Sequence, residues 1–202
     1  MTAKTCYFNM YHMAEIKPDR KRVTLTDGKI LLRPYRMSDA DSLHKAIRES
    51  IKEISPWLPF AHEGYAVKET KDWLKKRNKE WNKGFTYDFG IFDAKDGSLI
   101  GGCGINGPIH MMHHANLGYW VRTSRIGQGA APAATRLLAK WGFDVLKLNR
   151  IEVVVAVGNE KSLRAALKAG AKREGVLRNR LVLRDKVQDA VMHSLIPDDF
   201  KT

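Results

Sequence analysis

The residues with the clearest chemical potential are two glycines, Gly127 and Gly129, between an apolar run and a helical pattern. Glycine has no Cβ, so its backbone N–H can approach a ligand closely. The first N–H groups of a helix have no partner inside the helix, and the helix dipole favours negative charge there. Pro132 fits an early helical position, where its missing N–H costs little. The pattern predicts a phosphate site, although a lone Gly-x-Gly more often marks a tight turn without a ligand.

Two nucleotide-binding motifs can be compared with this turn. A Walker A loop requires Gly-Lys-Ser/Thr, which is absent here. A dinucleotide fingerprint requires a third glycine, and the chain has Pro132 at that position. Glu152 lies at a tolerable distance along the chain for a ribose contact, so the residues alone leave this second alternative open.

The turn must be positioned by the elements around it. Alternating or glycine-interrupted apolar runs predict three strands before it, in TYDFGIFD, SLIGGCGIN and ANLGYWVR. After the turn, apolar residues at helical spacing predict a helix with one buried face; they are Ala134, Leu137, Leu138, Trp141 and Val145. RIEVVVAV predicts a strand, and NEKSLRAALKAG predicts a short helix with Asn159 as N-cap and Gly170 at its end. Strands near GVLRNRLVL and KVQDAVMHSLI close the chain.

The first part of the chain is predicted to contain a hairpin and two helices. Residues 1–22 are interpreted as an irregular extension, and a hairpin is expected around Asp27-Gly28. A helix is predicted over Ser38–Ile51 with Ser38 as N-cap, and a second over Val67–Lys83. The order of strands and helices indicates a mixed α/β domain, with the glycine turn at the first strand-to-helix crossover.

Composition limits the class of protein. The 202 residues are 44% hydrophobic, enough for one domain with a core, and no apolar run approaches the ~18 residues of a membrane span. The N-terminus lacks the pattern of a secretory signal. Cys6 and Cys103 suggest no disulfide framework, which favours a reducing, cytoplasmic location and no membrane association. The formal charge of +13 favours anionic partners, although the basic residues are spread along the chain.

Several motifs in the right order resemble a known family. GYWVRTSRIGQGAAPAATRLLAKWGFDVLKLNRIEVVV, followed by NEKSLRAALKAGAKREGVLRNRL, resembles the GNAT superfamily of acetyl-CoA-dependent N-acetyltransferases. LLRPYRMSDADSL and WLPF are similar to the opening of its RimJ/RimL branch, which acetylates protein N-termini, including those of ribosomal proteins. The resemblance covers about Leu31 to Ile196. It implies a mixed, mostly antiparallel central sheet flanked by helices over residues 23–202.

The resemblance also implies residue roles. The turn would offer backbone amides to the pyrophosphate of acetyl-CoA, from Ile126, Gly127, Gln128, Gly129, Ala130 and Ala131. The backbone of Trp120 and Val121 would pair with the pantetheine arm, and Asn159 matches the family's pantetheine-contacting Asn. Ser162 matches the Ser of the family's Asn-x-x-Ser, and Lys168 matches the Lys of its Lys-x-Gly. Ile126 replaces the usual Gln or Arg, with Arg125 beside it, and Ala171 replaces the usual aromatic. Helix capping is the simpler role for Asn159.

For the chemistry, the resemblance makes Ser162 the candidate proton donor to sulfur and the Val121 N–H the candidate donor to the thioester oxygen. Many members carry Glu where this chain has Asn116, which cannot accept a proton. An α-amine with a pKa of about 7.7–8.0 is roughly a quarter to two-fifths neutral near pH 7.5, whereas a lysine at about 10.4 is only about 0.1% neutral. We therefore expect a protein N-terminus as acceptor.

Two other functions stay open. The acceptor could be a small amine such as an antibiotic or a polyamine, or the domain could be a non-catalytic binder of RNA or ribosomes. Ribosome association and a homodimer are expected by analogy with the family alone. We expect no metal: His110, His113 and His114 lack a local carboxylate or cysteine partner. The segment with Trp57 and Phe60 is a candidate lining of the acceptor groove.

Overall fold

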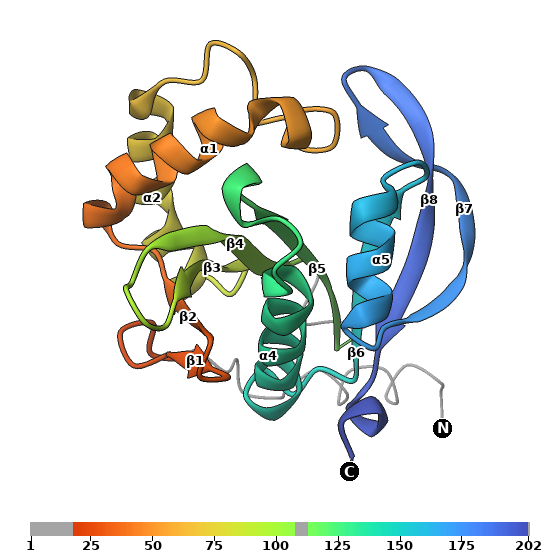
Figure 1. The fold of residues 1–202 in the computed structure, drawn as a ribbon. Coiled ribbons are helices and arrows are strands. Elements are labelled where there is room, and N and C mark those ends of the chain that lie inside the picture. The colour runs from red at the N-terminus through yellow and green to blue at the C-terminus, as the bar shows by residue number, and fades with distance from the viewer. Residues whose placement is uncertain (1–17, 108–112, 202) are drawn as a thin grey trace, which may run out of the picture.

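A single sheet of eight strands organises the molecule. The computed structural model describes residues 18–107 and 113–201, and its strands lie in the order β1-β2-β3-β4-β5-β6-β8-β7 (Figure 1). The strands are β1 Leu25–Thr26, β2 Ile30–Pro34, β3 Thr86–Asp93, β4 Leu99–Asn106, β5 His114–Val121, β6 Arg150–Ala156, β7 Lys172–Leu183 and β8 Lys186–Leu195. All neighbouring strands are antiparallel except β5 and β6. The predicted mixed, mostly antiparallel sheet is confirmed, and the parallel sheet of a dinucleotide-binding fold is not present among the described residues.

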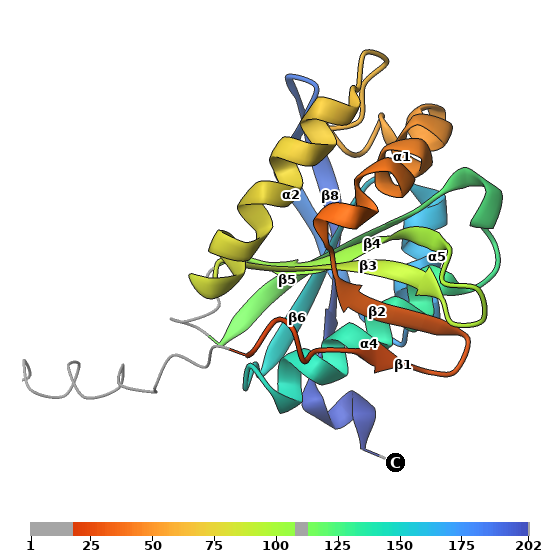
Figure 2. The same cartoon turned by 90° about the vertical axis from the view of Figure 1, so that its left-hand side faces the viewer.

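Helices cover both faces of this sheet. Helices α1 (Ala40–Ile54) and α2 (Val67–Asn82) lie on one face, and α4 (Ala130–Asp144) and α5 (Glu160–Lys168) lie on the other (Figure 2). Two clusters of buried apolar side chains correspond to the two faces. The larger includes the α4 stripe with β3 to β6, and the smaller includes the inner side chains of α1 and α2.

The start of α1 differs from the prediction. Ser38 is not the N-cap, because a short 3-10 turn, Met37–Asp39, precedes the helix. The buried Asp39 carboxylate accepts a hydrogen bond from the Arg36 backbone N–H at 2.7 Å and pairs with the Arg33 guanidinium at 2.8 Å. These two contacts organise the turn, and α1 itself begins one residue later. The other predicted elements are confirmed to within a few residues.

The sheet parts between β5 and β6. These strands pair only at His114–Arg150, Ala115–Ile151 and Asn116–Glu152. Beyond that point β5 continues along β4 to Val121, while β6 continues along β8 to Ala156. The two strands therefore diverge over the half of β5 that leads to the glycine turn, and the opening between them is a feature that only the pairing reveals.

The described part of the N-terminal segment, residues 18–22, lies against the domain. The buried indole of Trp81 donates a hydrogen bond from Nε1 to the Pro18 carbonyl at 2.8 Å. Residues 1–17 and His110 lie outside the described residues, and the boundary at residue 22 stays a prediction. None of the helices in the described ranges combines the length and apolar character needed to cross a membrane.

Candidate functional site

The edge of β5 that faces the opening presents free backbone groups. Arg122 donates its N–H to the Ile100 carbonyl of β4 at 2.8 Å. Because residues of an antiparallel strand alternate in the direction of their N–H and C=O groups, Trp120 also turns its backbone towards β4. Tyr119 and Val121 turn theirs towards the opening. The predicted role of the Val121 N–H thus has the required direction, whereas the Trp120 backbone does not.

The opposite edge of the opening is the free edge of β6. The Val157 N–H bonds to the Asp189 carbonyl at 3.1 Å, on the side of β8. By the same alternation, Val154 and Ala156 turn their backbone groups away from β8 and towards β5. The Ala156 carbonyl already accepts the Asn159 N–H at 3.1 Å, so Val154 and the Ala156 N–H provide the available groups of this edge. Two strand edges with available N–H and C=O groups therefore face each other, which suits an extended ligand that contains amide groups.

The glycine turn has the backbone conformation that requires glycine. Gly127 and Gly129 both have φ of 83°, and Gly129 is the N-cap of α4. A Cβ at either position would meet nothing within 4 Å, so the space above the turn is open. The first amides of α4, at Ala130 and Ala131, lie beyond the turn and have no partner within the helix. The Ile126 N–H differs, since it donates to the Thr123 carbonyl at 3.3 Å.

Helix α1 holds the segment that precedes the turn. Glu49 accepts hydrogen bonds from the Ser124 backbone at 2.8 Å and from Arg122 Nε at 3.0 Å. The Ser50 hydroxyl accepts the Thr123 N–H at 3.0 Å. Hydrogen bonds from Arg122 and Ser124 lower the pKa of Glu49 to about 2. A polar face of α1 therefore sets the position of the chain just before the glycine turn and the first amides of α4.

Arg125 ties the turn to the β3–β4 connection. Its guanidinium pairs with Asp93 at 3.2 Å and donates to Ser98 Oγ at 3.0 Å. It also reaches Gln128 Oε1 at 3.5 Å. Carboxylate pairing offsets part of its charge, so its evident contribution here is to position the turn.

Ser162 lies beside the opening through a contact with β5. Its hydroxyl donates to Tyr119 Oη at 3.1 Å, and Tyr119 donates in turn to the Ser162 carbonyl at 2.9 Å. The Asn159 side chain accepts the Ser162 N–H at 3.2 Å, as a helix N-cap does. Burial raises the pKa of Tyr119, and the hydrogen bond with Ser162 opposes the rise. The Tyr119 hydroxyl, which sequence reasoning missed, thus links α5 to β5.

Lys168 lies away from Ser162 and from the opening between β5 and β6. It is the last residue of α5, six positions after Ser162, or about 9 Å along the helix axis. Its side chain is exposed. The structure therefore brings together Val121, the glycine turn and Ser162, and places Lys168 at the far end of α5.

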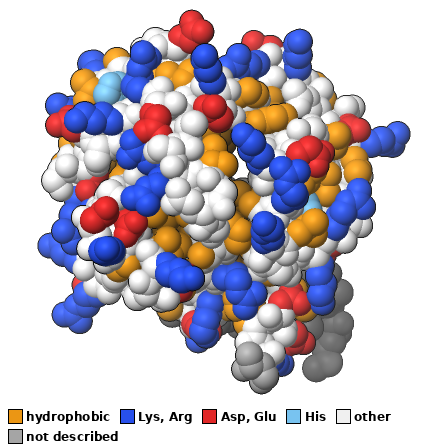
Figure 3. All heavy atoms as spheres, viewed as in Figure 1, with side chains coloured by type: hydrophobic (Ala, Val, Ile, Leu, Met, Phe, Trp, Pro, Cys, Tyr) orange, Lys and Arg blue, Asp and Glu red, His pale blue; other side chains and the backbone are white. Residues whose placement is uncertain are grey.

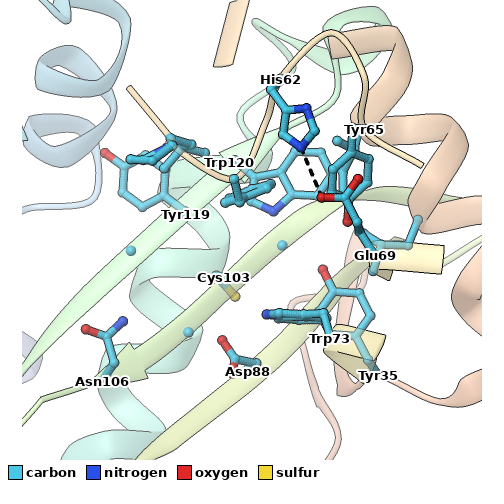
Figure 4. Close-up of a pocket in the computed structure, with 18 residues that line it drawn as sticks. Tyr35, His62, Tyr65, Glu69, Trp73, Asp88, Cys103, Asn106, Tyr119 and Trp120 are labelled. Carbon is cyan, nitrogen blue, oxygen red and sulfur yellow. Dashed lines mark hydrogen bonds and ion pairs between the residues drawn. The ribbon is translucent and has the colours of Figure 1, made fainter. Parts of the chain in front are cut away.

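A cavity of about 600 Å³ lies on the other face of the sheet, beneath α1 and α2 (Figure 4). Aromatic side chains form much of its wall: Tyr35, Phe60, Tyr65, Trp73 and Trp120. Phe60 lines it as expected, whereas Trp57 does not. The Trp120 side chain points into this cavity and not into the opening between β5 and β6 (Figure 4). The volume is typical of a small-ligand site.

Two carboxylates also line the cavity. Asp88 Oδ2 pairs with Arg77 at 2.6 Å, and burial raises the pKa of Asp88 although Arg77 opposes the rise. Glu69 pairs with His62 at 3.0 Å. Sequence reasoning missed both carboxylates. For Asp88 the available signal was an acidic residue between Tyr87 and Phe89 in the strand TYDFGIFD.

Asn116, which stands where a carboxylate was expected, has only amide chemistry to offer. Its Nδ2 donates to Asn106 Oδ1 at 3.3 Å, and its backbone pairs with Glu152 on β6. The Glu152 carboxylate is itself held by Arg150 at 3.0 Å. Neither residue is a free base at the point where the strands part.

Basic side chains surround the opening. Figure 3 shows the molecule hollowed between α4 and α5, with hydrophobic side chains inside the hollow and Lys and Arg side chains around it. With a formal charge of +13, the protein attracts anions to this face, because summed positive charge raises their local concentration.

Comparisons with known proteins agree with this geometry. Residues 29–172 match the family model for the acetyltransferase (GNAT) domain. The chain is 31% identical over 175 residues to "Probable N-acetyltransferase YjcK" of Bacillus subtilis, over 84% of this chain and 96% of that protein. It is 30% identical over 116 residues to the ribosomal-protein-serine acetyltransferase of Escherichia coli, over 57% and 64%. The structure of Mycobacterium smegmatis RimJ in complex with CoA-disulfide is similar with a TM-score of 0.79 at 26% identity, over 89% and 88%.

Proposed function

The chain belongs to the GNAT acetyltransferase family and is an N-acetyltransferase, and we propose that its acceptor is the α-amine of a protein N-terminus. The observation that carries the proposal is the opening between β5 and β6, with the glycine turn at its end and Ser162 at its side. Relatives named as ribosomal-protein acetyltransferases support a protein acceptor.

The residues around the opening fit acetyl-CoA, which supplies an activated acetyl thioester. Gly127 and Gly129 leave open space above the amides of the turn, as a pyrophosphate requires. The Tyr119 and Val121 backbone groups face the opening, where an extended pantetheine arm can pair with them. The free edge of β6 provides the second wall.

Two groups would act on the thioester. The Val121 N–H is directed into the opening and would stabilise negative charge that develops on the carbonyl oxygen. Ser162 would donate its hydroxyl proton or hydrogen bond to the departing sulfur. Tyr119, which accepts a hydrogen bond from the Ser162 hydroxyl, would orient that hydroxyl.

The cavity beneath α1 and α2 would receive the acceptor. It lies against the same strand, β5, whose other backbone groups face the opening. An α-amine suits this site because its pKa of about 7.7–8.0 lets it lose a proton near neutral pH far more readily than a lysine can.

A small polyamine or an aminoglycoside is the second candidate acceptor. The Glu69 and Asp88 carboxylates together with aromatic faces would also bind a compact polycation. A screen of acetyl transfer over N-terminal peptides and small amines, read by mass spectrometry, separates the two. We expect peptide N-termini to give the highest kcat/KM. A preference for free lysine or an aminoglycoside by orders of magnitude would make the proposal wrong.

The third alternative, a non-catalytic binder of RNA or ribosomes, is tested in the same preparation. It predicts tight CoA binding without turnover, together with RNA binding that weakens steeply as salt is raised. Turnover with any amine in the screen would contradict it.

A further inference from the structure

A row of three residues, of which two are glycines, crosses three neighbouring strands on the floor of the proposed acceptor cavity. Asp88 of β3 is directly opposite Gly104 of β4, and Gly104 is directly opposite Gly118 of β5. Opposite residues of antiparallel strands lie on the same face of the sheet. Both neighbours of Asp88 in this row are glycines, so no side chain of the row separates its carboxylate from the edge of β5 where the opening begins.

The Asp88 carboxylate leans over this row. A Cβ placed on Gly104 would lie only 2.7 Å from Asp88 Oδ1. At Gly118 a Cβ would meet nothing within 4 Å, so the row is filled at one end and open at the other. Figure 4 shows Asp88 between Trp73 and Asn106, directed towards the centre of the cavity.

The distance from the Asp88 carboxylate to the opening leaves room for one amine nitrogen between them. Adjacent strands are about 4.8 Å apart, so the opening beyond β5 begins about 7 Å from a carboxylate that lies over β4. A hydrogen bond from a charged nitrogen to a carboxylate spans about 2.8 Å, and a nitrogen poised for attack lies about 3–3.5 Å from the carbon it attacks. The sum, about 6 Å, fits an amine between Asp88 and an acyl carbon at the edge of the opening.

We propose that Asp88 is the residue that binds the acceptor's ammonium group and takes its proton before attack. This inference rests on the proposed function. It assigns to β3 the base that is missing at Asn116, and it makes a primary ammonium ion, entering past Trp73 and Trp120, the chemical class that the cavity recognises.

The proton and electron balance is as follows. The Asp88 carboxylate takes one proton from R–NH₃⁺, which leaves R–NH₂ and a neutral carboxyl group. The nitrogen lone pair forms the C–N bond, and the C–S bond breaks with its electron pair on sulfur. The nitrogen then loses a second proton, which reaches sulfur through Ser162 and yields the amide and the thiol. Asp88 finally returns its proton to water.

The surroundings of Asp88 favour this role. Burial raises its pKa, which brings a carboxylate closer to the pKa of an α-amine and makes the proton transfer less costly. The charged and titratable groups that face it are Arg77 and Glu80 of α2, Tyr35 after β2, Cys103 of β4 and Arg20. Arg77 favours the ionised carboxylate and so opposes the effect of burial, and the Asp88 side chain stays 20% exposed.

The first test is Asp88→Asn, which keeps the shape and removes the base. We expect kcat/KM for an N-terminal peptide to fall about 100-fold or more, with Kd for acetyl-CoA unchanged by calorimetry. In the unaltered protein kcat/KM should fall as pH drops through the raised pKa of Asp88. Asp88→Asn should lack this acidic limb, and its kcat/KM should follow only the pKa of the free amine, about 7.7–8.0. Asp88→Glu should restore part of the rate. Asp144→Asn, which removes an ion-paired carboxylate on α4, is the matched control and should change neither quantity.

The second test fills the bare row without touching Asp88. Gly118→Ala adds a methyl group where the structure has room, so the variant should fold, but the methyl lies in the path of the amine. We expect the acceptor KM to rise about 10-fold, with Kd for acetyl-CoA unchanged. Gly175→Ala in β7, where a Cβ also meets nothing within 4 Å, is the matched control and should leave KM as it is.

The outcomes separate this inference from the proposed function. If acetyl-CoA does not bind the unaltered protein, the proposed function fails and Asp88 loses its role with it. If acetyl-CoA binds and peptides are acetylated, but Asp88→Asn keeps the acidic limb and its kcat/KM, only the Asp88 assignment is wrong. Loss of the limb in Glu69→Gln instead would move the base to the Glu69–His62 pair.

Discussion

The two sides of the site are built in different ways. On the side proposed for acetyl-CoA, one continuous segment from Tyr119 to Ala131 supplies backbone groups, and α5 adds Ser162. On the proposed acceptor side, the lining comes from the residue after β2, α1, the loop before α2, α2 itself and the strands β3, β4 and β5. A backbone site leaves a glycine spacing in the sequence, because only glycine tolerates the conformation. A side-chain cavity assembled from distant segments leaves no such spacing.

Helix α1 joins the two sides. Its polar face holds residues 122–124 through Glu49 and Ser50. Its apolar face contributes Leu43 and Ile47 to the acceptor cavity. The same helix therefore contacts both sides of the proposed site.

The largest expected effect is on acetyl-CoA binding, and it follows from a substitution at Gly129. Gly129→Leu should weaken acetyl-CoA binding at least about 100-fold, because a side chain would occupy the space above the amides and would strain a φ of 83°. Gly28→Leu, at a turn with φ of 87° and nothing within 4 Å of a Cβ, carries the same strain away from the site. Calorimetry should show that only the first variant loses binding. Equal affinity for both would show that the turn does not bind the cofactor.

The next effect concerns the contact between Ser162 of α5 and Tyr119 of β5. Ser162→Ala should lower kcat about 10- to 100-fold through loss of the proton donor, with the acceptor KM nearly unchanged. Tyr119→Phe leaves the Ser162 hydroxyl in place and removes its hydrogen-bond partner, so a smaller loss is expected. Steady-state kinetics distinguishes the roles: a larger loss in Tyr119→Phe would identify Tyr119 as the donor.

A smaller effect is expected on the acceptor side alone. Phe60 lines the cavity and is 43% exposed, so Phe60→Ala should raise the acceptor KM about 3- to 10-fold with little loss of stability. Phe85→Ala removes a phenylalanine that is 59% exposed and lies outside the cavity. Kinetics with an N-terminal peptide should separate the two variants, and Kd for acetyl-CoA should stay constant in both. A weaker Kd in Phe60→Ala would contradict the separation of the two sides.

The smallest effect is on stability and concerns the link through α1. The pKa of Glu49 is about 2 in the folded protein against an ordinary 4.5, so its contribution is complete above pH 4.5 and is lost as pH falls towards 2. Because the pair with Arg122 is partly exposed, we expect about 1 kcal/mol. Denaturation of the unaltered protein and Glu49→Gln should differ by that amount at pH 6 and converge at pH 2. A difference that grows towards acid pH would contradict the assignment.

Most elements were predictable because their signals are local. Val67–Lys83 was predicted to within one residue by helical spacing, and TYDFGIFD and its two neighbours by strand patterns. The error at Ser38 arose because Asp39 is held by Arg33, a contact from a neighbouring strand. Asp88 was missed for the same kind of reason: its meaning depends on Gly104 and Gly118, which are adjacent only after the strands pair.

The sequence by itself determined the strands, the helices and a left-handed glycine turn before α4, because propensity, periodicity and the absence of a Cβ act within a few residues. Only the tertiary structure decided where β5 leaves β6, that the Trp120 backbone turns away from the opening, and that a carboxylate lies over a row of glycines. Strand pairing sets these features, and the pairing brings together residues that no short-range pattern connects.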